Sequence, residues 1–468
     1  MTAPSRSDPA ATESVIARLA ERFGDRLTTN VAIRETHGRG EGLHEVLPPD
    51  AVVFPETNEE VAAIVAICAA ARVALIPFGA GTSLEGQVQA PCGGISVDLT
   101  RMARVLSVSS DDLDCRVQAG VTREQLNHHL RDTGLFFPLD PGANATLGGM
   151  AATRASGTNA VRYGTMREVV LGLTLVTAEG EIIRTGGRAR KSATGYDLTR
   201  LYIGSEGTLG IITELQLRLF GIPEQTAACV CQFQDVAAAV GVVTNLLQMG
   251  VAVARIELLD ALQMQASIAY SKLEGMAALP TLFFELHGSK AAVDEQVMIL
   301  RTMCADAGGA ALRRADAQEE RSRLWKARHQ AYHAARALAP GSEAIATDAC
   351  VPISALARCI AETRADVATS GLICPLVGHV GDGNFHLLIL FDPNDPAQCA
   401  GAEALSARIS ARAIALGGTC SGEHGVGMHK LDAMQAEHGP AVAIMQRIKA
   451  ALDPHNIMNP GKTIPPVV

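Results

Sequence analysis

The sequence lacks an apolar run of the roughly 20 residues that a helix needs to cross a bilayer, so no transmembrane segment is expected. It also lacks a basic stripe, and its formal net charge is −9, so nucleic acid is not an expected partner. The N-terminus lacks the charged-then-apolar pattern of a secretory signal. These absences predict a cytoplasmic chain, for which peripheral attachment to the inner face of a membrane stays open.

A disulfide framework is also missing from the sequence. The 11 cysteines are odd in number and scattered, and none of them form a Cys-x-x-Cys pair. This pattern fits a reducing compartment in which thiols serve as small apolar residues. Apolar residues make up 48% of the 468 positions, which is enough for sizeable cores, and the length suggests two or three domains.

Changes in composition divide the chain into four parts. Residues 1–45 form a helical lead-in, and over 46–223 short strands alternate with helices and glycine-rich loops. Over 224–415, helical patterns such as 318–338 alternate with strands that suit an antiparallel sheet. A C-terminal segment follows over 416–468. The sequence therefore predicts an α+β fold in which a second domain with an antiparallel sheet follows a loop-rich domain.

Local signals indicate where several elements begin. Asn58 is expected to cap a helix, because two glutamates follow in its first turn, where the helix dipole favours them. Thr122 is expected to cap another helix that runs to about residue 132. A strand is expected over 95–98 and a long helix over 353–370.

Two histidines flank a turn-forming stretch near the end of the second large part. The apolar flanks and the Gly-Asp-Gly-Asn sequence over 381–384 predict a β-hairpin. If Val380 pairs with Phe385, His379 pairs with His386, and directly paired residues share a sheet face with Cβ atoms roughly 4.5–5.5 Å apart. We therefore expect both imidazoles to reach one divalent metal ion.

A carboxylate and a third histidine follow as Glu423 and His424. Two histidines and a carboxylate form a ligand set that leaves coordination positions open for a substrate. Zinc and manganese both suit such ligands, so the metal is left open between them. The structural alternative is a pair of histidines hydrogen-bonded at a strand end.

Glycine-rich loops recur in the part over 46–223. The first, over 76–86, follows an apolar strand; its glycines let backbone N–H groups approach an anion, and Thr82 and Ser83 add hydroxyl donors. A dinucleotide pyrophosphate would suit this loop. The Rossmann fingerprint fits less well, because Leu84 stands at the third glycine position. A plain structural turn remains an alternative for this loop alone.

Two further loops make turns alone an insufficient explanation. The stretch over 140–164 mixes small residues with hydroxyls and carries almost no acid after Asp140, and a third glycine-rich run spans 204–212. Such segments can wrap a large flat ligand while keeping backbone donors inward.

These three loops, in this order, resemble the FAD domain of the vanillyl-alcohol oxidase type, the family that includes p-cresol methylhydroxylase. The histidine hairpin, the segment 421–425 and the Asn-Pro-Gly-Lys sequence over 459–462 are similar to the D-2-hydroxyacid dehydrogenase branch of that family, and to its D-lactate-oxidising (cytochrome) type. The resemblance covers roughly residues 45–465. It implies a two-lobed FAD-binding domain, a substrate (cap) domain on an antiparallel sheet, and a C-terminal segment that returns to the flavin.

The resemblance also implies which residues hold the cofactor. No histidine or cysteine is identifiable as a covalent flavin anchor, so the FAD is expected to be bound non-covalently. The cofactor-binding residues implied are Pro77, Gly79, Ala80, Gly81, Thr82, Ser83, Gly86, Pro141, Gly142, Thr146, Gly149, Ser156, Gly157, Tyr163, Glu206, Gly207, Ile212 and Asn459.

The same resemblance implies the reaction. The metal held by His379, His386 and Glu423 would bind the substrate's α-hydroxyl and lower its pKa. His424 would take the hydroxyl proton as general base, and the C2 hydrogen would leave as hydride to flavin N5. Neighbours in an extended segment point to opposite sides, so Glu423 can bind metal while His424 faces the substrate.

A cationic partner for the substrate carboxylate is also expected. Trp325, Arg328 and Tyr332 lie at i, i+3 and i+7, which is one face of a helix. Arg328 matches the carboxylate-binding arginine of the family, and its fork suits bidentate capture. Taken alone, Arg328 reads as a solvated charge, and Tyr332 reads equally well as a partly buried core residue.

Two departures from the hydroxyglutarate-oxidising relatives bear on the substrate. Those relatives carry a lysine two residues before the aspartate that matches Asp348, and an asparagine two residues after the second metal histidine. This chain has Ala346 and Leu388 there. Both changes favour D-lactate or another D-2-hydroxy acid with a short or apolar tail.

Several alternatives remain open at this point. Glycolate or D-2-hydroxyglutarate could be the substrate within the same branch, and a metal-dependent hydrolase using His379, His386 and Glu423 is a rival of another class. The electron acceptor could be a cytochrome, a quinone or an electron-transfer flavoprotein. A homodimer is one of the oligomeric states left open.

Overall fold

The computed structural model describes residues 6–42 and 45–466, which form two compact units. The first unit comprises Met1–Ser156, Gly164–Ile222 and Glu423–Val468, and the second comprises Gly157–Tyr163 and Pro223–Gly422. Residues 1–5 and 43–44 of the predicted lead-in, and 467–468 of the predicted C-terminal segment, lie outside the described residues.

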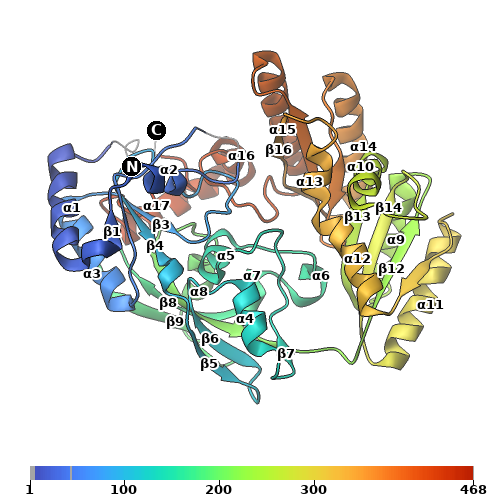
Figure 1. Ribbon diagram of the computed structural model, residues 1–468, viewed down its shortest axis with the longest axis horizontal. Coiled ribbons are helices and arrows are strands. Elements are labelled where there is room, and N and C mark those ends of the chain that lie inside the picture. The colour runs from blue at the N-terminus through green and yellow to red at the C-terminus, as the bar shows by residue number, and fades with distance from the viewer. Residues whose placement is uncertain (1–5, 43–44, 467–468) are drawn as a thin grey trace. The chain divides into compact units, whose positions relative to one another are not determined.

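A small mixed sheet begins the first unit (Figure 1). Its order is β1-β2-β4-β3, in which β2, β4 and β3 run parallel and β1 pairs antiparallel with β2. The strands are β1 (Leu27–Thr28), β2 (Ala51–Val53), β3 (Leu75–Phe78) and β4 (Ile95–Asp98). The first glycine-rich loop leaves the carboxyl end of β3, so the parallel strands position it.

An antiparallel sheet of order β5-β6-β10-β8-β9 forms the other layer of strands in the first unit. Its strands are β5 (Val105–Ser109), β6 (Asp114–Gln118), β8 (Val170–Val176), β9 (Ile182–Gly186) and β10 (Ile211–Arg218). A separate pair joins β7 (Leu135–Phe136) to β11 (Phe220–Gly221). The second and third glycine-rich loops precede β8 and β10.

Helices cover these sheets and close one apolar core, which includes Leu19, Ile64, Leu75, Leu215 and Met458. The helices of this unit are α1 (Pro9–Phe23), α2 (Val31–His37), α3 (Asn58–Ala71), α4 (Arg123–Leu130), α5 (Leu147–Thr153), α7 (Met166–Val169), α8 (Leu198–Tyr202), α16 (Leu431–His438) and α17 (Val442–Leu452), with 3-10 turns at Gly24–Arg26, Leu99–Arg101 and Gly439–Ala441. The burial of Met458 draws the C-terminal segment into the same core.

The second unit is built on one antiparallel sheet of order β15-β12-β14-β13-β18-β19-β16, with β17 also paired to β19. The strands are β12 (Gln225–Gln232), β13 (Val253–Leu259), β14 (Thr281–Gly288), β15 (Arg313–Ala315), β16 (Glu343–Ala346), β17 (Ala349–Cys350), β18 (Leu376–Gly378) and β19 (Asn384–Phe391). The histidine hairpin therefore lies inside a wide sheet.

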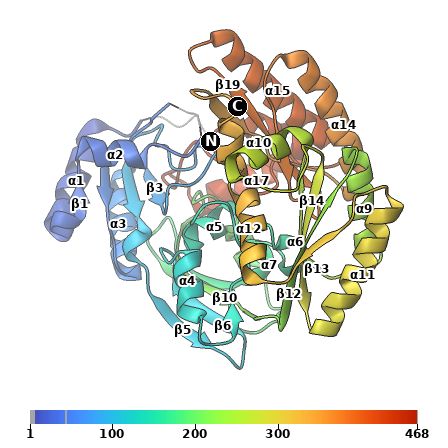
Figure 2. The same ribbon diagram turned by 45° about the vertical axis from the view of Figure 1, so that its right-hand side comes forward.

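Helices lie on both sides of this sheet, with α9 and α11 opposite α12 (Figures 1 and 2). An apolar cluster joins Met264, Trp325 and Ala331 of one helix layer to Phe283 and Val377 of the sheet. The helices are α6 (Ala160–Tyr163), α9 (Val236–Gln248), α10 (Ala261–Ser271), α11 (Lys290–Asp306), α12 (Gln318–His329), α13 (Ala331–Arg336), α14 (Ile353–Ser370) and α15 (Pro396–Ala415). None of the helices formed by the described residues has the length and apolar character that crossing a membrane requires.

Several local predictions can be compared with these elements. The strand over Ile95–Asp98 and the helix over Ile353–Ser370 are as predicted. Thr122 caps α4 through a capping box with Gln125, and the helix ends at Leu130, two residues early.

The prediction that Asn58 caps a helix is wrong. The cap is Thr57, whose hydroxyl accepts a hydrogen bond from the Glu60 amide at 3.2 Å. Asn58 is the first helical residue, and its Nδ2 instead donates to Glu214 Oε1 at 2.9 Å. This long-range bond gives the asparagine a different role from the one that the local sequence favoured.

The predicted single helix over 318–338 is also wrong, because it breaks at Gln330 into α12 and α13. Gln330 has φ −86° and ψ 7°, outside ideal helix geometry. At the break, Ser271 Oγ donates to Gln330 Oε1 at 3.2 Å, and Gln263 Nε2 donates to the Ala331 carbonyl at 3.0 Å. Both partners come from α10, so tertiary hydrogen bonds hold the interruption.

Candidate active site

The histidine hairpin forms in a different register from the predicted one. Val377, not His379, lies opposite His386. His379 lies at the turn, where its carbonyl accepts hydrogen bonds from the amides of Asp382 at 2.9 Å and Asn384 at 3.3 Å. Asn384 is the first residue of β19, where it lies opposite Cys350 of β17, and its Nδ2 donates to Asp348 Oδ1 at 2.9 Å. The predicted pairing of Val380 with Phe385 is therefore wrong.

The two imidazoles nevertheless lie side by side in this register. With Val377 opposite His386, His379 is a diagonal neighbour of His386 on the same face of the sheet. Their ring centroids lie 5.4 Å apart with the planes at 84°. A ring nitrogen of one lies within 4.8 Å of a ring nitrogen of the other. This spacing suits two ligands of one divalent cation.

Each imidazole is oriented by an acceptor at Nδ1. His379 Nδ1 lies 2.6 Å from Glu257 Oε1, and His386 Nδ1 lies 2.9 Å from the Thr347 carbonyl oxygen. An ionised carboxylate and a carbonyl can only accept, so both Nδ1 atoms carry hydrogen and Nε2 is the atom suited to a metal. The donor set thus fits a divalent cation on chemical grounds.

Glu257 is the residue of this site that sequence reasoning missed. It is fully buried, and its Oε2 lies 2.6 Å from both Nε and Nη2 of Arg328. Burial raises the pKa of the Glu257 carboxyl, but Arg328 and His379 outweigh that effect and hold the pKa below its ordinary value. Leu258 pairs with Gly378, which sets Glu257 beside His379 on neighbouring strands.

The three residues predicted to share one helical face are divided by the break at Gln330. Trp325 and Arg328 lie on α12, whereas Tyr332 lies on α13 and is 37% exposed. The predicted continuous face is therefore wrong for Tyr332. The Trp325 ring is buried beneath the Arg255 guanidinium at 4.8 Å, and its Nε1 has no hydrogen-bond partner among the described residues.

Asp348 organises the end of the segment that leads to Glu423. Its Oδ2 accepts a hydrogen bond from Ser421 Oγ at 2.9 Å, and its carbonyl accepts one from the Gly422 amide at 3.1 Å. Asp348 Oδ1 also lies 3.8 Å from His386 Nδ1. These bonds hold Ser421 and Gly422, the two residues that directly precede Glu423 in the chain.

The two positions that differ from the hydroxyglutarate-oxidising relatives are direct partners in the sheet. Ala346 of β16 lies opposite Leu388 of β19. Leu388 is buried and shares its sheet face with His386, two residues earlier in the same strand. The surface beside His386 is therefore apolar.

In the first unit, the loop after β3 passes very close to Thr146. A Cβ on Gly79 would meet Thr146 Oγ1 at 2.2 Å, and one on Gly81, which has φ +72°, would meet the Phe78 ring at 2.8 Å. Ser83 Oγ and Ser205 Oγ are buried without a hydrogen-bond partner among the described residues. A glycine-lined loop with unused hydroxyl donors fits the phosphates of a dinucleotide.

The other predicted cofactor residues fall into both units. Thr146 caps α5 by accepting the Gly149 amide at 3.3 Å. Ser156 ends a segment of the first unit, whereas Gly157 and Tyr163 belong to the second, where the Tyr163 hydroxyl lies 2.8 Å from His287 Nδ1. The remaining predicted residues are in the first unit: Pro77, Ala80, Thr82, Gly86, Pro141, Gly142, Glu206, Gly207, Ile212 and Asn459.

Glu206 ties the C-terminal segment to the third glycine-rich loop. Its carboxylate accepts hydrogen bonds from the Val426 amide at 2.7 Å, the Gly427 amide at 2.8 Å and Thr463 Oγ1 at 3.0 Å. Burial raises the pKa of this carboxyl despite those bonds. The Asn459 side chain donates to the Glu206 carbonyl at 2.7 Å. The C-terminal segment is therefore anchored inside the first unit.

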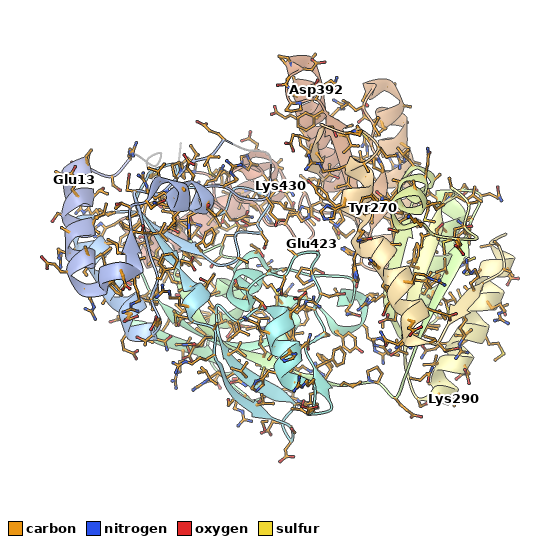
Figure 3. The ribbon with its side chains drawn as sticks, in the orientation of Figure 1. Glu13, Tyr270, Lys290, Asp392, Glu423 and Lys430 are labelled. Atoms are coloured by element: carbon orange, nitrogen blue, oxygen red, sulfur yellow. The ribbon has the colours of Figure 1, made fainter. Side chains whose placement is uncertain are left out.

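Glu423 and His424 begin that C-terminal segment, which also carries Lys430 (Figure 3). Gln87 Nε2 donates to the His424 carbonyl at 2.8 Å, and His424 Nδ1 lies 3.8 Å from Glu85 Oε1. Burial raises the pKa of the Glu85 carboxyl, but Lys430 at 2.8 Å and His424 outweigh it, so the pKa lies below its ordinary value. His424 therefore lies beside the end of the first glycine-rich loop.

Comparison with known protein families accounts for both units. The model described as FAD binding domain matches residues 49–186, and the one described as FAD linked oxidases, C-terminal domain, matches residues 222–463. The chain belongs to the FAD-linked oxidase family. It is an FAD-binding oxidoreductase. The family models therefore support the prediction of a flavoenzyme and not the rival prediction of a hydrolase.

Relatives and solved structures agree with this family. A zebrafish (Danio rerio) protein named probable D-lactate dehydrogenase, mitochondrial, is 50% identical and the match covers 97% of this chain and 92% of the relative. D-lactate dehydrogenase [cytochrome], mitochondrial, of Arabidopsis thaliana is 44% identical over 97% and 81%. A glycolate oxidase subunit of Bacillus subtilis is 34% identical over 88% of each chain. The resemblance to the D-lactate-oxidising branch is thus confirmed.

The fold class is confirmed by structural similarity. The solved structure of p-cresol methylhydroxylase superposes with a TM-score of 0.81 at 19% identity, covering 98% of each chain. At this identity the likeness concerns the fold. It supports the predicted vanillyl-alcohol oxidase architecture, with a cap domain on an antiparallel sheet.

Proposed function

We propose that this chain oxidises D-lactate, or a related D-2-hydroxy acid with a short or apolar tail, to the 2-oxo acid. The observation that carries the proposal is the pair of imidazoles, His379 and His386, each held at Nδ1 by an acceptor; the acceptor of His379, Glu257, is also paired with Arg328. The names of the zebrafish and Arabidopsis relatives support the same substrate.

In this proposal His379, His386 and Glu423 hold one divalent cation, zinc or manganese. The nitrogen and carboxylate donors suit either ion. When bound, FAD supplies a two-electron acceptor, and the cation lowers the pKa of a coordinated hydroxyl.

The chain's own residues then orient the substrate and move its proton. Arg328 binds the carboxylate, with Trp325 and Tyr332 bordering the substrate, and His424 takes the α-hydroxyl proton as the C2–H bond breaks. The bond of Arg328 to Glu257 leaves Nη1 of the fork on the side away from that carboxylate. Glu257 therefore links Arg328, which is proposed to bind the substrate, to His379, which is proposed to bind the metal.

The apolar partners Ala346 and Leu388 support a short substrate tail. A second carboxylate placed beside His386 would be desolvated there without a cationic partner, which is costly. Glycolate, which has no tail, is the second candidate, favoured by the match to a glycolate oxidase subunit.

Introducing the lysine and asparagine of the hydroxyglutarate-oxidising relatives at these two positions should change the substrate preference. In the double variant Ala346→Lys with Leu388→Asn, we expect kcat/KM for D-2-hydroxyglutarate to rise about tenfold or more relative to D-lactate. This corresponds to one new charge-assisted contact of about 1.5–3 kcal/mol. Steady-state kinetics on both acids measures the ratio; Ala346→Leu, which adds bulk without charge, is the matched control. An unchanged ratio in the double variant would contradict the assignment.

We further propose that a cytochrome, a quinone or an electron-transfer flavoprotein reoxidises the enzyme; a cytochrome agrees with the name of the Arabidopsis relative. We also propose that the protein is cytoplasmic and that it forms a homodimer. The zebrafish and Arabidopsis relatives are both named as mitochondrial, which points to a different compartment for those proteins.

Anaerobic bleaching of the flavin spectrum tests the function directly. We expect D-lactate to bleach the holoenzyme, D-2-hydroxyglutarate to act poorly, and a chelator to abolish bleaching until zinc or manganese is restored. Reduction by L-lactate but not D-lactate would overturn the stereochemical assignment. Full bleaching after complete metal removal would overturn the metal-dependent mechanism while leaving the flavin reaction intact.

A further inference from the structure

The carboxylate of Glu257 connects two groups to which the proposed function gives separate tasks. Its Oε1 lies 2.6 Å from Nδ1 of His379, and its Oε2 lies 2.6 Å from Nε and Nη2 of Arg328. Glu257 itself is 0% exposed. A fully buried carboxylate is costly unless its charge is matched, and these two partners match it on both oxygens.

The position of Glu257 is set by the sheet. Strands β13 and β18 pair in the register Leu258 opposite Gly378, and β18 continues into the turn that carries His379. Glu257 lies on the face that carries Phe283, its direct partner on β14, and this is the face against which α12 packs. Strand β13 therefore places the Glu257 carboxylate within hydrogen-bond distance of both His379 and Arg328.

A second buried carboxylate–histidine pair in the same sheet provides a comparison. Glu285 Oε1 lies 2.8 Å from Nε2 of His287, and Arg255 Nε lies 3.4 Å from the same oxygen. There, the other ring nitrogen of His287 contacts the Tyr163 hydroxyl at 2.8 Å. Both nitrogens of His287 are thus engaged by protein groups, so this pair does not present a ligand atom to a metal.

We propose that Glu257 is the positioning residue of the metal site: it fixes the tautomer and ring orientation of His379 and is itself held by Arg328. This inference rests on the proposed function, since it assumes that His379 binds the cation. A carboxylate on Nδ1 keeps the hydrogen there, directs the Nε2 lone pair outward and makes that nitrogen a better donor. Arg328 prevents the carboxylate from turning away.

Metal titration of the FAD-loaded, metal-stripped protein tests the proposal without substrate. In Glu257→Gln, we expect the Kd for Zn²⁺ or Mn²⁺, measured by calorimetry, to rise about 10–100-fold, the loss typical when the partner of a metal-bound histidine is removed. Glu285→Gln alters the comparable buried pair on the neighbouring strand, and its metal Kd should remain that of the wild type.

The outcomes separate the inference from the function on which it rests. A Kd for Glu257→Gln within twofold of the wild-type value overturns the positioning role while leaving the metal site intact. A wild-type protein that binds neither ion overturns the metal site itself, and the positioning role with it. Equal weakening in Glu257→Gln and Glu285→Gln assigns the effect to general loosening of the sheet, which also overturns the proposal.

A second variant covers the case in which Glu257→Gln does not fold, because that change leaves the Arg328 charge buried without its partner. The double variant Glu257→Gln with Arg328→Met removes the unmatched charge. Since the titration contains no substrate, the missing arginine does not affect the readout directly. The double variant should show the same 10–100-fold rise in the metal Kd, and wild-type affinity in it would overturn the proposal.

Discussion

Replacing His386 with alanine is expected to remove the bound divalent metal and to lower kcat/KM for D-lactate by about 1000-fold. The reason is that a Lewis acid contributes several kcal/mol of charge stabilisation, and each 1.36 kcal/mol corresponds to about tenfold in rate. His386 lies in the sheet with its Nδ1 fixed on the Thr347 carbonyl, which leaves Nε2 as the ligand atom that the substitution removes. Elemental analysis of the purified protein and steady-state kinetics measure the two effects.

The control for this variant is His129→Ala, which removes an exposed histidine on α4 of the first unit. Metal content and kcat/KM of His129→Ala should match the wild type. FAD content should be unchanged in both variants, because neither histidine is among the predicted cofactor residues, and the glycine-rich loop over 76–86 belongs to the first unit. A His386→Ala protein that stays active after losing its metal would show that the cation has no part in the reaction.

Replacing His424 with alanine is expected to lower kcat for D-lactate about 10²–10⁴-fold, the range for loss of a general base, while metal and FAD contents remain those of the wild type. The expectation follows from the proposed role of His424 in taking the hydroxyl proton. His424 is held by its backbone through Gln87 and lies next to Glu85. Rapid-reaction measurement of flavin reduction isolates this step from reoxidation.

The matched control is His455→Ala, an exposed histidine of the same C-terminal segment. It should reduce the flavin at the wild-type rate. Loss of the metal from His424→Ala would assign His424 to the ligand set instead of to proton transfer. Wild-type reduction rates in His424→Ala would assign the base to another residue.

Elements specified by local sequence were predictable. The strand over Ile95–Asp98 and the helix over Ile353–Ser370 follow from their own apolar patterns, and Thr122 caps its helix with residues three positions away. The glycine-rich loops were predictable because close approach of the backbone to an anion requires glycine, which enriches such loops in that residue. The family resemblance then supplied the fold and the flavin.

What could not be predicted depends on contacts distant in sequence. The bond between Glu257 and His379 joins positions 122 residues apart. Strand β13 alternates apolar Ala254, Ile256 and Leu258 with Arg255 and Glu257, a pattern that predicts a solvent-facing side for the two charged residues. In the structure that side packs against α12, and Glu257 is fully buried.

The hairpin and the helix break fail for a similar reason. Asn384 looks like a turn residue, but it begins β19, where it pairs with Cys350 of β17 and its side chain donates to Asp348. Gln330 suits a helix interior, yet side chains of α10 bind the backbone and side chain at this point. In each case a partner that the local sequence does not contain overrides the local preference.

The short segment Gly157–Tyr163 has a practical consequence for domain exchange between flavoenzymes of this family. It belongs to the second unit although it lies far from residues 223–422 in sequence. Within it, Asn159 Oδ1 accepts from Arg255 Nε at 3.0 Å, and Arg162 Nη1 donates to the His287 carbonyl at 3.0 Å. A chimaera that transplants only the long contiguous stretch would graft a cap onto a foreign seven-residue insert, so the recombination boundaries have to include both pieces.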